Sequence, residues 1–172
     1  MPQFPANPTR RDPYKNFKFR VRIDGQVVLG ASKVSALIRT TEVIKFRQGG
    51  DLSGPILTPG KTDFTAIAVE EAIAFGSVIP VWAGMMWNHE AAPGGGREMG
   101  LKNFRKNISI ELLNEAGQLA IKYNVFRCWI SEYQPLGELD ANGNAVAISR
   151  IKIENEGWER DADVSEPVEV AL

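Results

Sequence analysis

The sequence predicts a mainly β protein, an antiparallel β-sandwich or barrel of about seven to eight strands with one α-helix. Three observations support this fold class. Apolar and polar side chains alternate with a period of two residues along several segments, as they do in half-buried strands. Turn-forming residues separate these segments at short intervals, which is typical of antiparallel hairpins. Helical patterns do not recur between the strands, so a doubly wound α/β fold is excluded.

The length and composition fit one globular domain. The 172 residues fall within the usual size of a single domain. Hydrophobic residues make up 44% of the chain and charged residues 24%, so there is enough apolar material for a core. We expect one domain over residues 1–172, with an N-terminal arm at 1–13 and an acidic C-terminal tail at 157–172.

Residues 17–24 give the clearest strand pattern of the N-terminal part. Apolar residues at the odd positions alternate with charged residues, which places the two classes on opposite faces of a strand. The pair Asp24-Gly25 tolerates the positive backbone angles of a tight turn. We therefore expect a hairpin in which residues 26–31 form the partner strand, followed by a third extended segment over residues 40–47.

Residues 48–60 predict a long polar loop. They contain four glycines and two prolines in thirteen positions. Loops of this length in compact domains tend to be functional or mobile, and a partner surface could order this one. After the loop, alternating apolar residues over 63–69 predict another strand.

A single helix is expected over residues 77–87. Ser77 can act as its N-cap, and Pro80 fits its first turn. Its apolar character suggests that it covers one side of the domain, and residues 91–96 then form a second loop. Residues 72–87 are interrupted by glycine and proline and are shorter than the roughly 18–20 residues of a membrane span, so no membrane anchor is expected. The N-terminus lacks the apolar stretch of a signal peptide.

The second half returns to a strand pattern. Residues 107–113 and 119–125 alternate around a turn at 114–117, and the second strand continues to residue 133 across a bulge that shifts the apolar parity. Residues 146–156 form the last strand, with Ile151 and Ile153 facing inward. We expect the charged tail from Gly157 onward to add little to the core.

Basic and acidic residues are unevenly distributed, although the formal net charge is −1. Residues 1–47 hold 10 basic and 3 acidic side chains, a local charge of +7, and the rest of the chain holds 10 basic and 18 acidic ones. Three interpretations fit this asymmetry: solvated faces without a role, a basic patch for nucleic acid, or opposite poles that attract when copies stack head to tail.

The single cysteine and the single histidine exclude several functional classes. Cys128 cannot form an internal disulfide, so a reducing compartment is expected. It lies within a strand pattern, where a packed thiol is more common than a reactive one. His89 leaves too few soft ligands for a zinc site. His89 and Glu90 could form an acid–base pair, but no nucleophile stands at a recognisable spacing, so we interpret His89 as a surface residue.

Three further motifs are weak candidates for chemistry. Residues 140–144 have oxygen ligands at the spacing of a calcium loop, but the glycine is one place early and Ile151 occupies the position of the bidentate glutamate. Residues 94–100 lack the lysine and hydroxyl of a phosphate-binding loop. Glu70 and Glu71 are adjacent, and adjacent residues of a strand point to opposite faces, so they do not form a catalytic pair. We expect no catalytic residue, no metal site and no cofactor.

Several segments carry a family resemblance when they are taken together. They are DPYKNFKFRV at 12–21 with IDG at 23–25, TEVIKFRQGGD at 41–51, RKNISIELLNEAG at 105–117, NAVAI at 144–148 and ENEGWER at 154–160. In this combination and order, the chain resembles the tail-tube proteins of contractile phages and related contractile injection systems. It departs from them at residues 69–72, where Val-Glu-Glu-Ala replaces the basic Lys-Arg-Gly turn usual in the family.

The resemblance implies a structural subunit of an inner tube, without catalytic residues. Family members form hexameric rings that stack into a hollow tube inside a contractile sheath, and the sheets of neighbouring subunits join to line the lumen. Residues 48–60 resemble the extended loop that reaches an adjacent ring. We therefore expect neighbour contacts from Arg47, Gln48, Gly49, Gly50, Asp51 and Leu52, and lumen positions for Glu70 and Glu71.

The resemblance also implies partners and a location. The partners are further copies of the chain, the sheath protein, the baseplate or tube-starter, the tape-measure and the terminator proteins, and the lumen cargo is DNA or effector proteins. Assembly is expected in the bacterial cytoplasm, for a phage tail or a released injection particle. Two alternatives stay open: a specialised tube-starter subunit at the baseplate, and a small-ligand-binding β-barrel. The sequence does not separate a phage from a bacteriocin or an extracellular injection system.

Overall fold

The structure is a computed structural model that describes residues 4–8, 10, 12–28, 31–47, 49–50, 54–72, 78–86, 104–140 and 146–168. These residues form ten strands and one helix. In chain order the elements are β1 (Phe19–Ile23), β2 (Gln26–Val28), β3 (Ala31–Val34), β4 (Arg39–Phe46), β5 (Ile56–Phe64), β6 (Ile67–Ala72), α1 (Val78–Gly84), β7 (Lys106–Leu113), β8 (Leu119–Gln134), β9 (Ile148–Glu154) and β10 (Gly157–Arg160).

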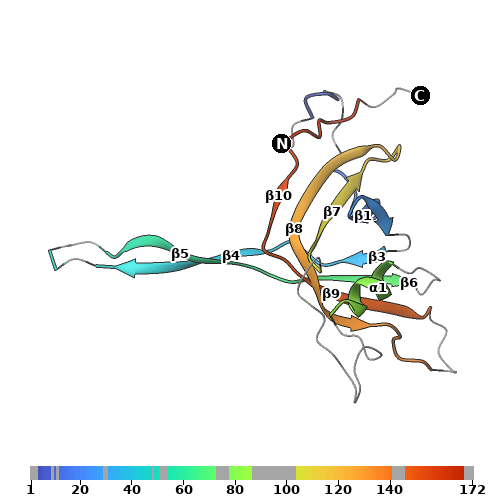
Figure 1. Cartoon of the computed structure of the whole chain (residues 1–172). Coiled ribbons are helices and arrows are strands. Elements are labelled where there is room, and N and C mark those ends of the chain that lie inside the picture. Colours follow the sequence, from blue (N-terminus) through green and yellow to red (C-terminus); the bar gives the residue numbers. More distant parts are fainter. Residues whose placement is uncertain are drawn as a thin grey trace, which may run out of the picture.

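The strands form one large curved sheet and one separate ribbon. The large sheet has the order β2-β1-β7-β8-β9-β6-β3, with β10 also paired to β8, and β4 pairs with β5 in the ribbon. Every pairing is antiparallel. Figure 1 shows the sheet curling on itself while the β4–β5 ribbon projects away from the body. The predicted mainly antiparallel β fold is confirmed.

The first hairpin closes at the dipeptide that the sequence indicated. Asp24 has a φ of 48° and Gly25 a φ of 81°, so both turn residues occupy the left-handed region that such a two-residue turn requires. The inward residues Val21 and Ile23 are buried, as the alternation predicted. Of the partner strand predicted over residues 26–31, residues 26–28 form β2, residues 29–30 lie outside the described residues, and Ala31 belongs to β3, which pairs with β6 instead.

β8 connects the two halves of the curved sheet. Its first part pairs with β7 and β10, and residues 129–134 pair with β9. At Arg127 the backbone φ is 52°, and the register against β7 shifts between Lys106 and Ile108. Val125 faces the core before this bulge and Cys128 faces it afterwards, so the bulge changes which alternate residues point inward. It also bends the strand, so the two halves of the sheet face each other. The bulge predicted in this strand is confirmed.

The core fills the space between the two halves of the sheet. It includes Ile23 from β1, Val69 from β6, Val125 from β8 and Ile153 from β9, all nearly inaccessible to water. α1 covers one side with Ile79 and Trp82, which are three residues apart and therefore share a face of the helix. The Trp82 indole N–H donates to the Phe104 carbonyl at 2.8 Å, which satisfies a buried polar group.

The helix was expected over a longer range than the structure describes. Pro80 lies in the first turn of α1, as predicted, where its missing N–H costs no helical hydrogen bond. Ser77 and Trp87, the expected ends, lie outside the described residues, as do the predicted loop at 91–96, the glycine-rich motif at 94–100, and His89 and Glu90.

Three boundary predictions are wrong. Residues 56–60 were assigned to the loop, but they begin β5, where Pro59 pairs with Val43 at the edge of a two-stranded ribbon that tolerates proline. The single strand expected over 63–69 is two strands, because Thr65 and Ala66 separate β5 from β6. The segment after Gly157 does contribute to the core, since β10 pairs with β8 and Trp158 packs against the core cluster.

Candidate functional site

The most unusual surface is the ribbon of β4 and β5, which we call the arm (residues 39–64). Every residue of β4 is exposed, and β5 is exposed at all positions except Gly60 and Phe64. Five large apolar side chains are more than half exposed: Val43, Ile44, Phe46, Ile56 and Leu57. An isolated two-stranded hairpin is marginally stable in water, and apolar patches of this kind mark protein contacts. The arm therefore has the composition of a surface that another molecule covers.

The base of the arm is fixed to the body by aromatic contacts. The Phe64 ring lies edge-on to Trp158, with centroids 6.3 Å apart, and Trp158 lies edge-on to Tyr123 at 5.9 Å. The Arg39 guanidinium stacks over the Trp158 ring at 6.0 Å. The Thr65 N–H also donates to the Ile38 carbonyl at 3.0 Å. The arm thus leaves the body from a defined anchor at β10.

The two faces of the arm differ in charge. Beyond a bulge after Thr41, the paired residues Phe46 and Ile56 share one face with Ile44. A Cβ at Gly60 would lie 3.1 Å from the Ile44 Cγ1 and 3.2 Å from the Glu42 Cβ, so Glu42 projects to that same face. We call this the Ile44 face. It carries apolar side chains and, toward the base of the arm, the Glu42 carboxylate. The opposite Val43 face carries Val43, Leu57 and Lys45.

Three of the six predicted interface residues are described, and they lie at the end of this arm. Arg47 follows β4, and Gly49 and Gly50 lie in the turn beyond it, all exposed. Gln48, Asp51 and Leu52 are outside the described residues. The structure adds the apolar residues of the arm, which the sequence reasoning missed. Their signal was a segment with apolar residues on both strand faces, Val43-Ile44 and Ile56-Leu57, which is typical of a strand covered on both sides.

Glu70 and Glu71 lie in β6, and their side chains take opposite faces of the sheet. Glu70 projects outward, 4.0 Å from the Lys33 ammonium and 3.8 Å from the Arg150 guanidinium. Glu71 projects toward the core face, where it accepts a hydrogen bond from the Ser149 hydroxyl at 3.4 Å. Burial raises the pKa of Glu71 and, with the nearby Glu71 charge, that of Tyr133. A surface formed by the outer side of β6 can therefore present Glu70, and not Glu71.

The outer face of β3, β6, β9 and the end of β8 carries mixed charges. Its cations are Lys33, Arg150 and Lys152, and its carboxylates are Glu70, Glu132 and Glu154. Lys152 stands opposite Glu132 across the strands, and Ser131 donates to the Glu154 carboxylate at 2.9 Å. The face therefore carries balanced charges, with Ile148 as an exposed apolar residue at one end.

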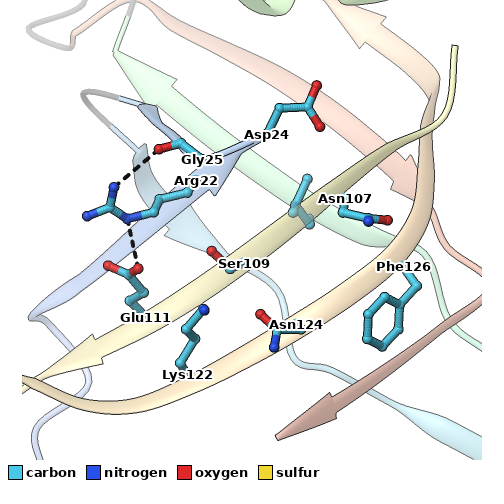
Figure 2. Close-up of a pocket in the computed structure, with 10 residues that line it drawn as sticks. Arg22, Asp24, Gly25, Asn107, Ser109, Glu111, Lys122, Asn124 and Phe126 are labelled. Atoms are coloured by element: carbon cyan, nitrogen blue, oxygen red, sulfur yellow. Dashed lines mark hydrogen bonds and ion pairs between the residues drawn. The ribbon is translucent and has the colours of Figure 1, made fainter. Parts of the chain in front are cut away.

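A second polar surface lies over β1, β7 and β8. It is hollowed by a cavity of about 580 Å³ that Arg22, Ser109, Lys122 and Asn124 help to line. Figure 2 shows Arg22 reaching both the Glu111 carboxylate, at 2.7 Å, and the Gly25 carbonyl, at 3.2 Å. Lys122 and Asn124 donate to Asp161 at 2.9 and 3.2 Å. These contacts pair the charges of the hollow with one another.

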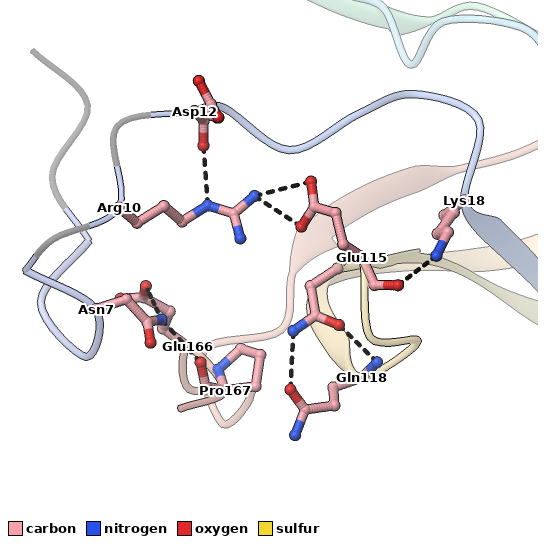
Figure 3. Close-up of polar contacts among 9 residues, drawn as sticks. Asn7, Arg10, Asp12, Lys18, Glu115, Gln118, Glu166 and Pro167 are labelled. Atoms are coloured by element: carbon pink, nitrogen blue, oxygen red, sulfur yellow. Dashed lines mark hydrogen bonds and ion pairs between the residues drawn. The ribbon is translucent and has the colours of Figure 1, made fainter. Parts of the chain in front are cut away.

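Described residues near the two ends of the chain meet in a cluster that we call the terminal clasp. Asn7 Nδ2 donates to the Glu166 carboxylate at 2.6 Å and to the Pro167 carbonyl at 2.9 Å. Arg10 pairs with Glu115 at 3.1 Å and stacks over the Phe4 and Tyr14 rings. The Lys18 ammonium donates to the Glu115 carbonyl. Figure 3 shows Arg10 at the Glu115 carboxylate, Lys18 at the Glu115 backbone carbonyl and Asn7 at Glu166.

Cys128 and the remaining candidate motifs show no arrangement for chemistry. Cys128 is fully buried in the core, and burial raises the pKa of its thiol to about 12. Asp140 is exposed, and residues 141–144 lie outside the described part. Among the residues that the structure describes, no three His, Cys, Asp or Glu side chains gather as a metal site would require. The described part also holds no helix whose length and hydropathy would carry it across a bilayer.

A β-sandwich with an anchored, uncovered apolar arm defines a structural subunit that assembles with other molecules. The family model described as "T4-like virus tail tube protein gp19" matches residues 15–159, and the chain belongs to this family. It is thus a tube protein and not an enzyme. No curated protein sequence gives a significant match.

Solved structures share the fold. A chain of the anti-feeding prophage (AFP) baseplate matches with a TM-score of 0.69 and 17% identity, covering 94% of this chain and 100% of that one. A chain of the PVC sheath-tube complex, from an extracellular contractile injection system, matches with a TM-score of 0.70 and 19% identity. The match covers 94% of this chain and 99% of that one. Hcp1 from Flavobacterium johnsoniae matches with a TM-score of 0.53 and 14% identity, covering 88% of this chain and 100% of that one.

Proposed function

We propose that the chain forms hexameric rings that stack into the inner tube of a contractile tail or injection system, and that the tube's bore conducts DNA or effector proteins. The observation that carries this proposal is the exposed apolar arm, anchored at its base and uncovered within its own chain. A heterologous contact between an arm and a different surface of the next copy generates rings or open stacks. The arm tip, with Arg47, Gly49 and Gly50, supplies the contact to an adjacent ring.

The mixed-charge face of β3, β6, β9 and β8 is our candidate for the lining of the bore. Both edge strands of this part of the sheet, β3 and residues 129–134 of β8, have one side without a strand partner in the described chain. Such edges can pair with a neighbouring subunit and continue the sheet around a ring. A near-neutral polar surface holds passing cargo weakly. Of the two glutamates expected in the lumen, this arrangement exposes Glu70.

The partners follow from the tube itself. They are other copies, the sheath protein, the baseplate or tube-starter, and the tape-measure and terminator proteins, for a particle assembled in the bacterial cytoplasm. The similar structures come from a baseplate, a sheath-tube complex and a tube-terminating cap, which supports the sheath, baseplate and terminator partners. The baseplate and sheath-tube chains match with nearly equal TM-scores, so the tube-starter alternative stays open.

Electron microscopy of the purified full chain tests the proposal. The protein is examined by negative staining at low and high salt, across a range of concentrations. We expect six-fold rings or stacked tubes with a central hole. A monodisperse monomer in every condition, also after addition of a baseplate that could seed assembly, contradicts the tube and supports the ligand-binding barrel.

The bore assignment has its own test. Glu70→Lys changes the charge that each subunit contributes to the bore by two units. Glu71→Gln is the control, because it removes a carboxylate on the core face of the same strand. We expect tubes of both variants to form, and the Glu70 variant alone to change the amount of cargo that co-purifies with native particles. Unchanged cargo loading with Glu70→Lys contradicts a lumen position for this residue.

A further inference from the structure

One end of the core is polar. Three neighbouring strands of the large sheet bring a polar side chain to this end: Glu71 from β6, Ser149 from β9 and Tyr133 from β8. Glu71 pairs directly with Ser149 across the strands, near the end of β6 and the start of β9. Tyr133 lies near the end of β8. We call these three residues the core-end trio.

The core-end trio lies on the core face of the sheet. Successive residues of a strand point to opposite faces, so Glu71 shares its face with Val69, which is 2% exposed. Ser149 shares its face with Ile151, which is 3% exposed and pairs with Tyr133. Ser149 is itself buried, and Tyr133 packs against the core cluster. The half-buried Glu71 carboxyl therefore stands where the apolar core gives way to polar groups.

Within the described part of the chain, no cation pairs with the Glu71 carboxyl. Its hydrogen bond comes from the Ser149 hydroxyl, at 3.4 Å. On the other side of β6, Glu71 pairs with Ala31 of β3, and α1, which covers the core, has no charged residue. The titratable group that faces it from β8 is the Tyr133 phenol, which stays uncharged because burial and the Glu71 charge raise its pKa.

The adjacent Glu70 has the opposite surroundings. Its side chain lies on the outer face, 4.0 Å from the Lys33 ammonium and 3.8 Å from the Arg150 guanidinium. The same strand thus places one carboxylate between two cations and the next one against the core with a single neutral donor. Only the second arrangement makes the charged form of the side chain costly.

We propose that Glu71 is a proton-dependent latch: with its proton it holds the ends of β6, β9 and β8 closed on the core, and without its proton it loosens them. The latch belongs to the single chain and does not depend on the proposed tube. β6, β9 and this part of β8 carry the mixed-charge face on their outer side, so the latch sets how firmly that face is held to the body.

The direction of the pH effect follows from the burial of Glu71. Burial raises the pKa of this carboxyl above its ordinary value of 4.5, and the Ser149 hydrogen bond acts in the opposite direction. An acid whose pKa is higher in the folded state stabilises the fold fully below its unfolded pKa, and this contribution is lost as the pH rises through the folded pKa. Mildly acid conditions therefore close the latch, and higher pH opens it.

Thermal melts of the full chain at pH 7 and pH 4 test the latch. Glu71→Gln keeps the size of the side chain but cannot ionise. We expect the variant to melt about 3 °C above the wild type at pH 7, and with the wild type at pH 4, where both side chains are largely uncharged. The two proteins share every other titrating group, so the difference between their Tm values isolates residue 71. An equal difference at both pH values, or a variant that melts below the wild type at pH 7, overturns the latch.

Glu70→Gln is the matched control, because it removes the same formal charge from the adjacent position of the strand. We expect no gain in Tm at pH 7, since the carboxylate that is lost faces Lys33 and Arg150. A gain as large as that of Glu71→Gln would show an effect of net charge alone and would overturn the latch.

Amide hydrogen exchange locates the effect in the fold. The wild type and Glu71→Gln are compared at pH 7 and at one protein concentration, so their intrinsic exchange rates are equal. We expect exchange in the variant to be slower by a factor of about 3–10 in peptides that cover residues 67–72 and 148–151, and unchanged in peptides that cover residues 119–125. Equal exchange of the two proteins over residues 67–72 and 148–151 contradicts a latch at this end of the core.

Discussion

Trp158 is the side chain that joins the arm to the body. It contacts Phe64 at the base of the arm, Tyr123 of β8 and the Arg39 guanidinium. We expect Trp158→Ala to lower the free energy of unfolding by about 2 kcal/mol, because a half-buried aromatic cluster is lost. Urea unfolding followed by circular dichroism measures the change.

Val146→Ala is the control for this variant, since Val146 is 72% exposed. Its effect should stay below about 0.5 kcal/mol. Equal stability of the Trp158 variant and the wild type would show that the arm is not anchored through this residue.

Asp161 makes the stability of the folded protein depend on pH in the acid range. Hydrogen bonds from Lys122 and Asn124 hold the pKa of Asp161 below its ordinary value of 3.8. An acid whose pKa is lower in the folded state stabilises the fold above its unfolded pKa, and this contribution is lost as the pH falls through 3.8 and below. We therefore expect Asp161→Asn to lower the Tm at pH 7 and to flatten the decline of Tm between neutral pH and acid.

Asp163→Asn removes the same formal charge nearby and serves as the control. Asp163 contributes its backbone N–H to Asp161, and this donor remains in the variant. A thermal melt at each pH compares the three proteins. If both variants follow the wild-type curve, the Lys122–Asp161–Asn124 contact does not stabilise the fold.

At the scale of elements, the arm can be removed while the body is kept. Replacing residues 43–59 by Asn-Gly closes the ribbon after Glu42 and leaves the anchor at Phe64 in place. Because β4 and the outer part of β5 have little contact with the core, we expect a folded variant with a Tm close to that of the wild type and no assembly. Native mass spectrometry and a thermal melt measure the two properties. Rings or tubes formed by this variant would contradict the role of the arm.

The sequence predicted the elements whose cause is local. Alternation identified β1, β7, β8 and β9, and Asp24-Gly25 identified the first turn, because each depends on side chains within a few residues. The arm was harder to predict from the sequence. Pro59 and Gly60 have the composition of a loop, and their strand conformation depends on pairing with β4. The contribution of Trp158 was also hidden, since an acidic segment appears solvated until β8 is placed beside it.

The neighbour contacts at the end of the arm stay a prediction, and the sequence analysis missed the chemistry of the arm itself. The sequence placed neighbour contacts at the glycine-rich segment after Phe46, and the structure puts Arg47, Gly49 and Gly50 at the end of a projecting arm. It did not reveal that the apolar residues on both sides of that segment remain uncovered, because exposure is a property of the folded chain.

At the scale of the whole molecule, the charge asymmetry is partly neutralised within the chain. Arg10 of the basic N-terminal part pairs with Glu115, and Arg22 pairs with Glu111. The terminal clasp also brings the N-terminal segment to Glu166 of the acidic tail. These contacts satisfy part of the asymmetry inside one chain, so we base the proposed stacking on apolar contact through the arm rather than on opposite charges.

The mass distribution of the assembled protein decides whether the chain forms stacked hexameric rings. Native mass spectrometry of the full chain, measured across concentration and salt, reports how many copies associate. We expect species of six copies and multiples of six that persist at high salt, because the contact through the arm is mainly apolar. A monomer at every concentration, or an assembly that retains its mass when the arm is removed, would contradict it.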